Sequence, residues 1–284
     1  MKPKTCLFLP VISVLLLSCN TPRYMYAPSA SNVPVLVKQG DSKLAAYYST
    51  DLSGTSLSTN SSGKNKSNGL DVQGAVAITD NFAIQGSYMS RSERNASDEN
   101  NVDNTVITYK RNLAEFGIGY FNSMHPQDKV LFQFFGGVGK GRFSFVDDGI
   151  DDNGVYGLRH HEADVFKVYF QPAFLFRPKE NFVLSISSRF SIISFSDIKT
   201  DYSDLELQSY LLHDLPHGSR TFWEPAFTNT IGFKNLPGLK LEYQVAFALQ
   251  VDQRYIDYRN FNLALGIAFD IPKLFKPAPA VNKN

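Results

Sequence analysis

The histidines of this chain lie beside carboxylates in polar stretches, and their spacing limits the chemistry that they could support. The candidates are His160, His161, His213, Asp214 and His217. Imidazole and carboxylate groups bind zinc, and the four-residue spacing of the last two histidines suits one face of a helix. Pro216 interrupts such a helix. We therefore interpret these side chains as solvated loop residues and expect neither a metal nor a cofactor.

Two further motifs resemble ligand-binding loops, but each lacks a residue that its chemistry needs. The acidic stretch 147–153 resembles a calcium loop, yet Gly149 stands where the first carboxylate is required. The stretch 136–141 resembles a phosphate-binding loop, yet Gly141 replaces the Ser or Thr that follows the lysine in that motif. We interpret the first stretch as a polar loop and the second as glycines inside a barrel.

The elements that position these residues are predicted to be strands. From Leu239 to Val251 the odd positions are apolar and the even positions are polar or small. A strand turns successive side chains to opposite faces. At about 3.3 Å per residue this segment spans roughly 40 Å, enough to cross a bilayer at a tilt. The pattern therefore predicts a strand of a membrane β-barrel.

The same alternation recurs along the chain and predicts about ten strands, although eight or twelve would also give the even number that such barrels have. The expected strands are 43–50, 70–79, 82–91, 105–121, 130–146, 161–177, 182–196, 220–234, 239–251 and 257–271. Short and long connections alternate between them. We expect the long ones outside the cell, where they could bind ligands. They are 51–69, 92–104, 147–160 and 197–219.

The two faces of these strands distinguish a membrane barrel from a soluble lipid-anchored β domain, which remains the alternative. One face carries large Leu, Phe, Ile and Val residues that suit lipid, and the other carries small residues that suit a narrow interior. Charges of both signs share the inner face: Glu115, Lys167, Arg189, Glu224, Lys240 and Glu242. We interpret them as a structural plug of salt bridges, with an ion path or a binding cavity as the functional alternative.

One predicted strand changes phase. Phe132 and Phe134 lie on one face of the strand 130–146, whereas Phe143 and Phe145 lie on the other. A β-bulge in the glycine-rich stretch between them would turn all four side chains toward lipid. The alternative is that residues 143–146 have left the membrane.

The amino-terminal residues resemble a lipoprotein signal. Lys2 and Lys4 precede an apolar stretch that is too short to be a spanning helix. It ends in Leu16-Leu17-Ser18-Cys19, which resembles a bacterial lipobox. This resemblance implies that residues 1–18 are removed and that Cys19 becomes the lipid-modified first residue. Ordinary signal cleavage near the same point is the alternative.

The remaining boundaries follow from these elements. Residues 19–40 are rich in Pro, Ser, Asn and Ala, and we expect a lipidated tether in the periplasm. Residues 41–271 would form the barrel and 272–284 a short periplasmic tail, so both termini are expected in the periplasm. Asn20 departs from the Asp that retains some lipoproteins in the inner membrane, which favours the outer membrane.

The lipobox and the strand series together resemble small bacterial outer-membrane β-barrel proteins with a lipoprotein-type signal peptide. The predicted fold is all-β, a single up-and-down antiparallel transmembrane barrel in the outer membrane of a Gram-negative cell. Its partners would be membrane lipid and extracellular ligands. A formal net charge of +1 without a basic patch argues against binding to nucleic acid.

The expected role is structural or surface-interacting and not enzymatic. The first alternative is a small channel or a ligand-binding barrel. The second is an enzyme at the outer rim, because some barrels of this size and topology are proteases or lipid-modifying enzymes. Its candidate residues are His160, His161, Asp201, Asp204, His213 and Asp214. No serine nucleophile motif accompanies them.

Overall fold

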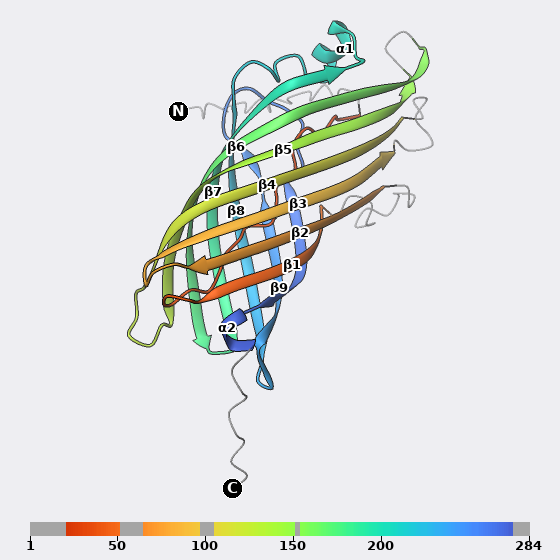
Figure 1. Ribbon diagram of the computed structural model, residues 1–284. Helices are drawn as coiled ribbons and strands as arrows, with labels where there is room; N and C mark the ends of the chain where they lie inside the picture. Colours follow the sequence, from red (N-terminus) through yellow and green to blue (C-terminus); the bar gives the residue numbers. More distant parts are fainter. Residues whose placement is uncertain (1–20, 52–64, 97–104, 151–153, 275–284) are drawn as a thin grey trace, which may run out of the picture.

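The computed structural model describes residues 21–51, 65–96, 105–150 and 154–274. Antiparallel strands wrap around a common axis and close on themselves (Figure 1). The strands are β1 (Ser42–Thr50), β2 (Lys66–Ala77), β3 (Phe82–Ala96), β4 (Val106–Ser123), β5 (Val130–Ile150), β6 (Tyr156–Lys179), β7 (Phe182–Thr200), β8 (Arg220–Phe233), β9 (Leu236–Phe247), β10 (Leu249–Gln250) and β11 (Phe261–Phe269).

The strands follow one another around the barrel in chain order. β9 and β10 are two parts of one strand, since only Ala248 separates them and both pair with β8. The wall therefore has ten strands. β1 pairs with β11, and this contact closes the ring. The prediction of a single up-and-down antiparallel barrel is confirmed, with all ten expected strands in place.

The two ends of the barrel differ in the length of their connections. At the short-turn end, residues 78–81, 124–129, 180–181 and 234–235 join neighbouring strands. At the long-loop end, the strands are joined by 51–65, 97–105, 151–155, 201–219 and 251–260. The last described residues form α2 (Ile271–Leu274) at the short-turn end, and α1 (Asp204–Ser209) lies at the long-loop end (Figure 1). In the described part of the chain, no helix has the length and apolar character needed to cross a membrane.

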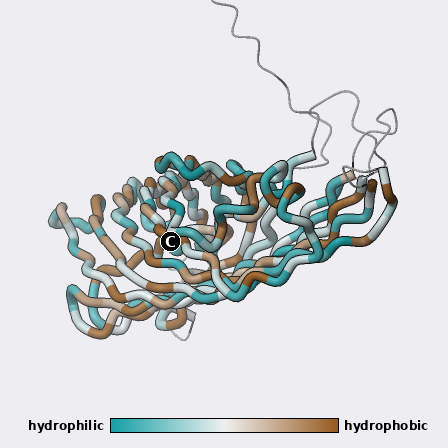
Figure 2. Tube along the Cα trace, turned by 90° about the horizontal axis from the view of Figure 1, so that it is seen from above, coloured by the Kyte–Doolittle hydropathy of each residue, from teal (hydrophilic) through white to brown (hydrophobic). Residues whose placement is uncertain are grey.

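An apolar belt surrounds the outside of the barrel next to the short-turn end. Each strand contributes exposed side chains from alternate positions, and Figure 2 shows this alternation of hydrophobic and hydrophilic residues along the strands. Members of the belt include Leu44, Val72, Phe82, Ile118, Phe134, Phe170, Ile186, Phe227, Tyr243 and Leu265. Ile118 is 65% exposed. A water-soluble barrel would bury this face, whereas lipid would cover it favourably.

Strands β2 to β7 continue beyond the belt toward the long-loop end, and we call this part the polar extension. Its outer face carries Ser90, Ser92, Arg94, Lys110, Asn112, Lys140, Arg142, Ser144, Glu162 and Asp164. Its inner face carries aromatic and aliphatic side chains together with buried, ion-paired charges such as Glu93 and Arg111. The extension therefore has the polarity of a water-soluble barrel, opposite to that of the belt.

β5 runs through both regions without a bulge. Its register with β4 and with β6 is constant over its whole length. Phe134 therefore faces out of the belt, whereas Phe143 and Phe145 face into the extension and are buried. The predicted bulge is wrong. The apolar residues of β5 change from the outer to the inner face along the strand, while the strand itself keeps its phase.

Residues 23–37 pass through the interior of the barrel, and we call them the luminal segment. The segment starts at the long-loop end, where Arg23 forms an ion pair with Asp147. It ends at the short-turn end. Three residues further on, the backbone N–H of Gly40 donates to the Ala77 oxygen at 3.0 Å. Gly40 has φ 84°, a conformation that suits glycine and turns the chain back into β1.

This course differs from the periplasmic tether expected for residues 19–40. The segment is extended, as expected for its composition, but it lies inside the barrel. Tyr26 and Ala27 are 0% exposed, and Met25 and Ala30 are 1% exposed. The first described residue, Thr21, and the last, Leu274, consequently lie at opposite ends of the barrel, whereas both termini were expected on one side. The apolar and small side chains of the luminal segment favour the barrel interior over water. The composition of residues 19–40 did not predict this course.

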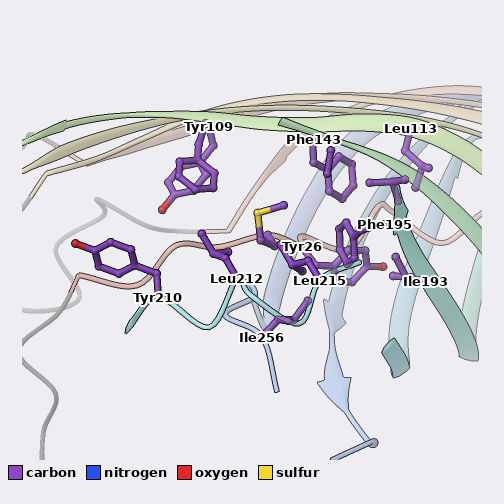
Figure 3. Packing of buried hydrophobic residues seen from close by; sticks show 14 of the residues in the cluster. Tyr26, Tyr109, Leu113, Phe143, Ile193, Phe195, Tyr210, Leu212, Leu215 and Ile256 are labelled. Carbon is purple, nitrogen blue, oxygen red and sulfur yellow. The ribbon is translucent and has the colours of Figure 1, made fainter. Parts of the chain in front are cut away.

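The interior of the polar extension is filled by one hydrophobic cluster. It joins the inner face of β3 to β8, the luminal segment and the long loops: Met25, Tyr26, Met89, Ile107, Tyr109, Leu113, Phe143, Phe145, Ile193, Phe195, Tyr202, Tyr210, Leu212, Leu215, Phe222 and Ile256. Figure 3 shows Tyr26 between the strand wall and the loop that carries Leu212 and Leu215. Residues 201–219, the cap loop, thus close the long-loop end with their apolar side chains.

Candidate functional site: a closed lumen

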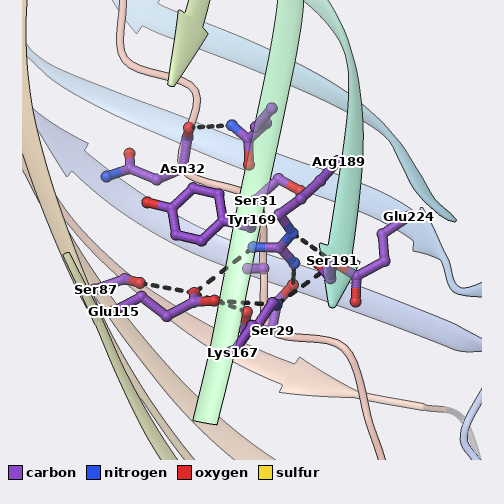
Figure 4. Close-up of polar contacts among 12 residues, drawn as sticks. Ser29, Ser31, Asn32, Ser87, Glu115, Lys167, Tyr169, Arg189, Ser191 and Glu224 are labelled. Atoms are coloured by element: carbon purple, nitrogen blue, oxygen red, sulfur yellow. Dashed lines mark hydrogen bonds and ion pairs between the residues drawn. The ribbon is translucent and has the colours of Figure 1, made fainter. Parts of the chain in front are cut away.

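Four charged side chains meet inside the belt. Lys167 Nζ lies 3.0 Å from Glu115 Oε1 and 3.5 Å from Glu224 Oε2. Arg189 Nη1 lies 3.6 Å from Glu115 Oε2, and its Nε lies 2.6 Å from Glu224 Oε2. The two cations and two anions balance, so each charge faces two opposite charges (Figure 4). Such mutual pairing is what allows charges to stay ionised away from water.

The strand register explains why these four residues meet. Glu115 on β4, Gly139 on β5 and Lys167 on β6 occupy one row across the sheet. A Cβ atom on Gly139 would lie 3.0 Å from Glu115 Cγ, so the absence of a side chain there lets the ion pair form across β5. Arg189 on β7 lies directly opposite Glu224 on β8. The glycine-rich stretch that resembles a phosphate loop is therefore part of a continuous strand.

The luminal segment takes part in this charge group. Tyr26 donates its hydroxyl hydrogen to Glu224, and Ser29 Oγ donates to Glu115 at 3.1 Å. The backbone oxygen of Ser29 accepts from Arg189 Nη2 at 2.8 Å. The segment therefore occupies hydrogen-bonding positions that water would fill in an open pore.

Glutamine side chains of the wall satisfy the backbone of the luminal segment, which has no strand partner there. Gln244 accepts from the Ser31 N–H at 2.7 Å and donates to the Ser31 oxygen at 2.9 Å. Gln171 Nε2 donates to the Asn32 oxygen at 2.7 Å, and Gln73 Nε2 to the Ala30 oxygen at 2.8 Å. Since buried backbone groups need partners, these glutamines hold an extended chain as a neighbouring strand would.

The wall is shaped to leave room for this segment. Ala30 packs with Ala45, Ala264 and Ala268, and Leu36 packs with Ala77 and Ala83 in a neighbouring cluster. Small residues on the inner face were interpreted as the filling of a narrow lumen. They instead leave a passage that a second piece of the same chain occupies.

Among the described residues, the lumen is closed along its length. Lys167, Ser191 and Asn262 are 0% exposed, and Glu224, Gln171 and Gln244 are 1% exposed. A water-filled channel would leave its lining side chains accessible. At the short-turn end, the residues around Lys43 and Glu242 enclose a volume of about 10 Å³, room for about one water molecule.

The two remaining lumen candidates lie nearer the short-turn end. Glu242 pairs with Lys43 at 2.8 Å and accepts a hydrogen bond from Tyr47. Lys240 Nζ lies 3.8 Å from Asp270. These pairs are separate from the group around Lys167. The six candidates are therefore divided between one group of four and two ion pairs, each with a further partner.

Sequence reasoning missed several buried charges. The luminal segment contributes Arg23, the wall contributes Asp71, Arg91, Glu93, Arg111 and Asp147, and the connection 251–260 contributes the partly buried Arg259. Arg111 Nη1 donates to Glu93 Oε2 at 2.9 Å, and Arg259 also pairs with Glu93. Arg91 and Arg111 already lie in the inward phase of the predicted strands 82–91 and 105–121, and continuing the alternation past residue 91 would also have identified Glu93.

The histidine candidates do not form a common site. His160 is on the outer face of β6, and His161 is on the inner face, where its Nδ1 lies 3.0 Å from Thr200 Oγ1. His213 and Asp214 are exposed neighbours, 3.3 Å apart, and the His213 and His217 rings lie 6.4 Å apart. Within the described ranges, no three His, Cys, Asp or Glu residues are arranged to hold a metal ion.

The other rim carboxylates have structural contacts. Asp201 accepts the backbone N–H of His160 at 3.0 Å. Asp204 is in the first turn of α1, which Ser203 and Glu206 cap reciprocally. In the acidic stretch 147–153, Asp147 faces Arg23 in the interior and Asp148 accepts from Tyr156 outside, while 151–153 lie outside the described residues. The described rim candidates therefore do not lie together as a catalytic group.

The cap loop is fixed to the extension by polar contacts. Arg159 Nη1 donates to Glu206 Oε1 at 2.5 Å, and Tyr202 donates to Asp147 at 2.6 Å. Burial alone would raise the pKa of Glu206, but hydrogen bonds from Ser203 and Arg159 outweigh it and lower that pKa. Glu206 is therefore held as a carboxylate.

The chain is similar to several solved structures at low sequence identity. No protein-family profile and no curated protein sequence matches the chain. The translocator domain of the autotransporter NalP from Neisseria meningitidis is 10% identical, with 81% of this chain and 88% of that chain covered and a TM-score of 0.43. The outer membrane protease OmpT from Escherichia coli is 12% identical, with 82% and 93% covered and a TM-score of 0.42. Ail, the attachment invasion locus protein of Yersinia pestis, is 12% identical, with 81% and 98% covered and a TM-score of 0.32.

Proposed function

We propose that the chain is a bacterial outer-membrane β-barrel lipoprotein that does not conduct solutes and that binds partners outside the cell through its long-loop end. Cys19, which lies outside the described residues, would carry the lipid. The single observation that carries the proposal is the closed lumen, whose polar side chains are buried against the luminal segment. A barrel filled in this way keeps its outer surface and its loops for function.

The apolar belt supports membrane insertion, and the long-loop end supports an interaction. Large apolar side chains are exposed there beyond the belt: Val155, Tyr156, Leu158, Leu205 and Leu211. Leu205 is 63% exposed although it lies on α1, beside buried members of the hydrophobic cluster. Exposed apolar side chains on a rigid surface are typical of partner-binding sites.

Fractionation tests the location. The purified outer membrane should contain the protein in a form whose gel mobility changes on heating, as a folded barrel requires. Recovery of the folded protein in a water-soluble fraction after removal of signal and lipid would contradict membrane insertion.

Conductance in planar bilayers tests whether the lumen is closed. The wild-type barrel should be silent. A variant without residues 24–37, which joins Arg23 directly to Lys38, should conduct because it lacks most of the luminal segment. Stable wild-type conductance equal to that of the deletion would refute the closed lumen and favour the channel alternative.

Photo-crosslinking on intact cells tests the interaction surface. A photoreactive amino acid in place of Leu211 should form adducts with an extracellular partner, and Tyr156→Ser with Leu158→Ser should reduce them. The same amino acid at Ile118 in the belt is the matched control and should form lipid adducts alone. Identical adducts at both positions would contradict a binding surface at the long-loop end.

A further inference from the structure

The luminal segment has a fixed direction. At its start, Arg23 pairs with Asp147, and the Met25 N–H donates to the Asp257 oxygen at 2.8 Å. Both partners belong to the long-loop end. Beyond its last residue, the Gln39 N–H donates to Asp80 Oδ1 at 3.0 Å in a short turn. The chain therefore enters the lumen at the long-loop end and leaves it at the short-turn end.

We propose that the protein is threaded across the membrane through its own barrel, so that the chain before Thr21 emerges on the side of the long loops. Cys19 precedes Thr21 by two positions. Two residues span at most about 7 Å, whereas the hydrocarbon core of a bilayer is about 30 Å thick. A lipid on Cys19 would therefore be displayed at the outer surface of the cell, while β1 still begins in the periplasm.

The contacts of the luminal segment oppose the reverse arrangement. A periplasmic Cys19 would require residues 21–37 to leave the lumen toward the short-turn end. Glu224 and Glu115 would lose hydroxyl donors, and Asp147 would lose the buried cation of Arg23. Met25 and Tyr26 would leave the hydrophobic cluster. Each loss destabilises the protein, because buried polar groups need partners and apolar side chains favour burial.

The threading of the chain and the surface position of the lipid depend on different observations. The threading depends on the described residues 21–40 alone. The surface lipid also depends on the proposed function, since it requires that Cys19 is acylated and that the long loops face outward. The experiments separate these premises.

Single cysteines at four positions test the threading on intact cells with a membrane-impermeant maleimide. Val155→Cys reports the long-loop end, and Met124→Cys reports the short-turn end, since each residue is 62% exposed. Thr21→Cys and Gln39→Cys mark the two ends of the threaded chain. Thr21→Cys should be labelled together with Val155→Cys, whereas Gln39→Cys and Met124→Cys should react only after permeabilisation.

Two outcomes would refute different statements. If Thr21→Cys behaves like Met124→Cys, the threading is wrong. If Met124→Cys is labelled on intact cells and Val155→Cys is protected, the orientation in the proposed function is wrong. In that case, labelling of Thr21→Cys together with Val155→Cys would still support threading.

A protease site inserted between Asn20 and Thr21 tests the lipid. Addition of the protease to intact cells grown with labelled palmitate should remove the label from the barrel and leave its heat-modifiable mobility unchanged. The same site between Gln39 and Gly40 should stay uncut, which makes it the matched control. A barrel that retains its palmitate after cutting at the first site would refute the surface lipid, and a barrel that never incorporates palmitate would refute the lipoprotein assignment.

Discussion

The belt and the polar extension are built from the same strands but have opposite polarity. In the belt, apolar side chains face outward and the ion-paired group of Glu115, Lys167, Arg189 and Glu224 faces inward. In the extension, charged side chains face outward and aromatic residues such as Phe143 fill the interior. The strand does not change phase between them. Only the medium outside it changes, and the side chains are distributed accordingly.

The comparison also explains the closure of the barrel. β8 pairs with β7 only as far as Ile193, and β1 ends at Thr50, so the wall of the extension is incomplete on their side. The cap loop supplies Leu212 and Leu215, and the luminal segment supplies Met25 and Tyr26 to the same cluster. The extension therefore encloses a hydrophobic cluster with buried ion pairs beside it and is closed by loops, whereas the belt encloses a polar interior that an extended chain fills.

The largest expected effect is in the belt interior. Glu224→Leu should leave Arg189 and Lys167 with Glu115 as their remaining anion, and a broken buried ion pair costs about 3–5 kcal/mol. The midpoint of urea unfolding in lipid vesicles, followed by gel mobility, measures this loss. Glu162→Gln, at an exposed pair with Arg142 in the extension, is the control and should change stability by about 1 kcal/mol or less. Equal losses would remove the distinction between the two regions.

Loss of packing should show a comparable effect in the extension. Phe143→Ala leaves a cavity in the cluster, and buried Phe→Ala changes cost about 3–5 kcal/mol. Phe170→Ala removes the same ring from the belt, where Phe170 is 48% exposed and lipid can refill the space. The same unfolding measurement should show a clearly smaller loss for Phe170→Ala. The reverse order would mean that the extension has no packed core.

A charge placed on the outer face of β5 should locate the boundary between the regions. Phe134→Arg puts a cation in the belt and should cost about 2–4 kcal/mol. Ser144→Arg, on the same face of the same strand, should cost about 1 kcal/mol or less because water surrounds the extension. Folding yield into vesicles and the unfolding midpoint measure both variants. Similar costs at the two positions would place both in one medium.

The smallest expected effect concerns the pH dependence of the cap loop. The lowered pKa of Glu206 means that its contribution is complete above the unfolded-state pKa of about 4.3 and is lost as the pH falls through the lower folded-state value. Protease cleavage within 201–219 should therefore increase between about pH 5 and pH 3, by roughly tenfold or less. Arg159→Gln should weaken this dependence. A cleavage rate that rises with pH instead would contradict the assignment.

Alternation along the chain was sufficient to predict the strands and the barrel, because every second residue of a strand faces the same side and those on an apolar side are apolar. It predicted the inward phase of Glu115, Lys167, Arg189 and Glu224. It did not predict that Gly139 would let Glu115 meet Lys167, since that contact depends on the register between β4, β5 and β6. Register depends on how two strands pair, and the sequence of one strand alone does not determine it.

The amino-terminal segment marks the limit of sequence reasoning. Residues 23–37 have no alternation and include Pro, Ser and Ala at two positions each, a composition that suits a tether as well as a plug. The sequence does not show whether the glutamines of the inner face bind water, ions or one another. In the structure, they donate hydrogen bonds to the backbone of the luminal segment: Gln73, Gln171 and Gln244. The sequence by itself therefore determined the ten strands, their two faces and the alternation of short and long connections. The tertiary structure alone decided what fills the barrel and in which direction the chain crosses it, because both depend on contacts between segments that lie far apart in the chain.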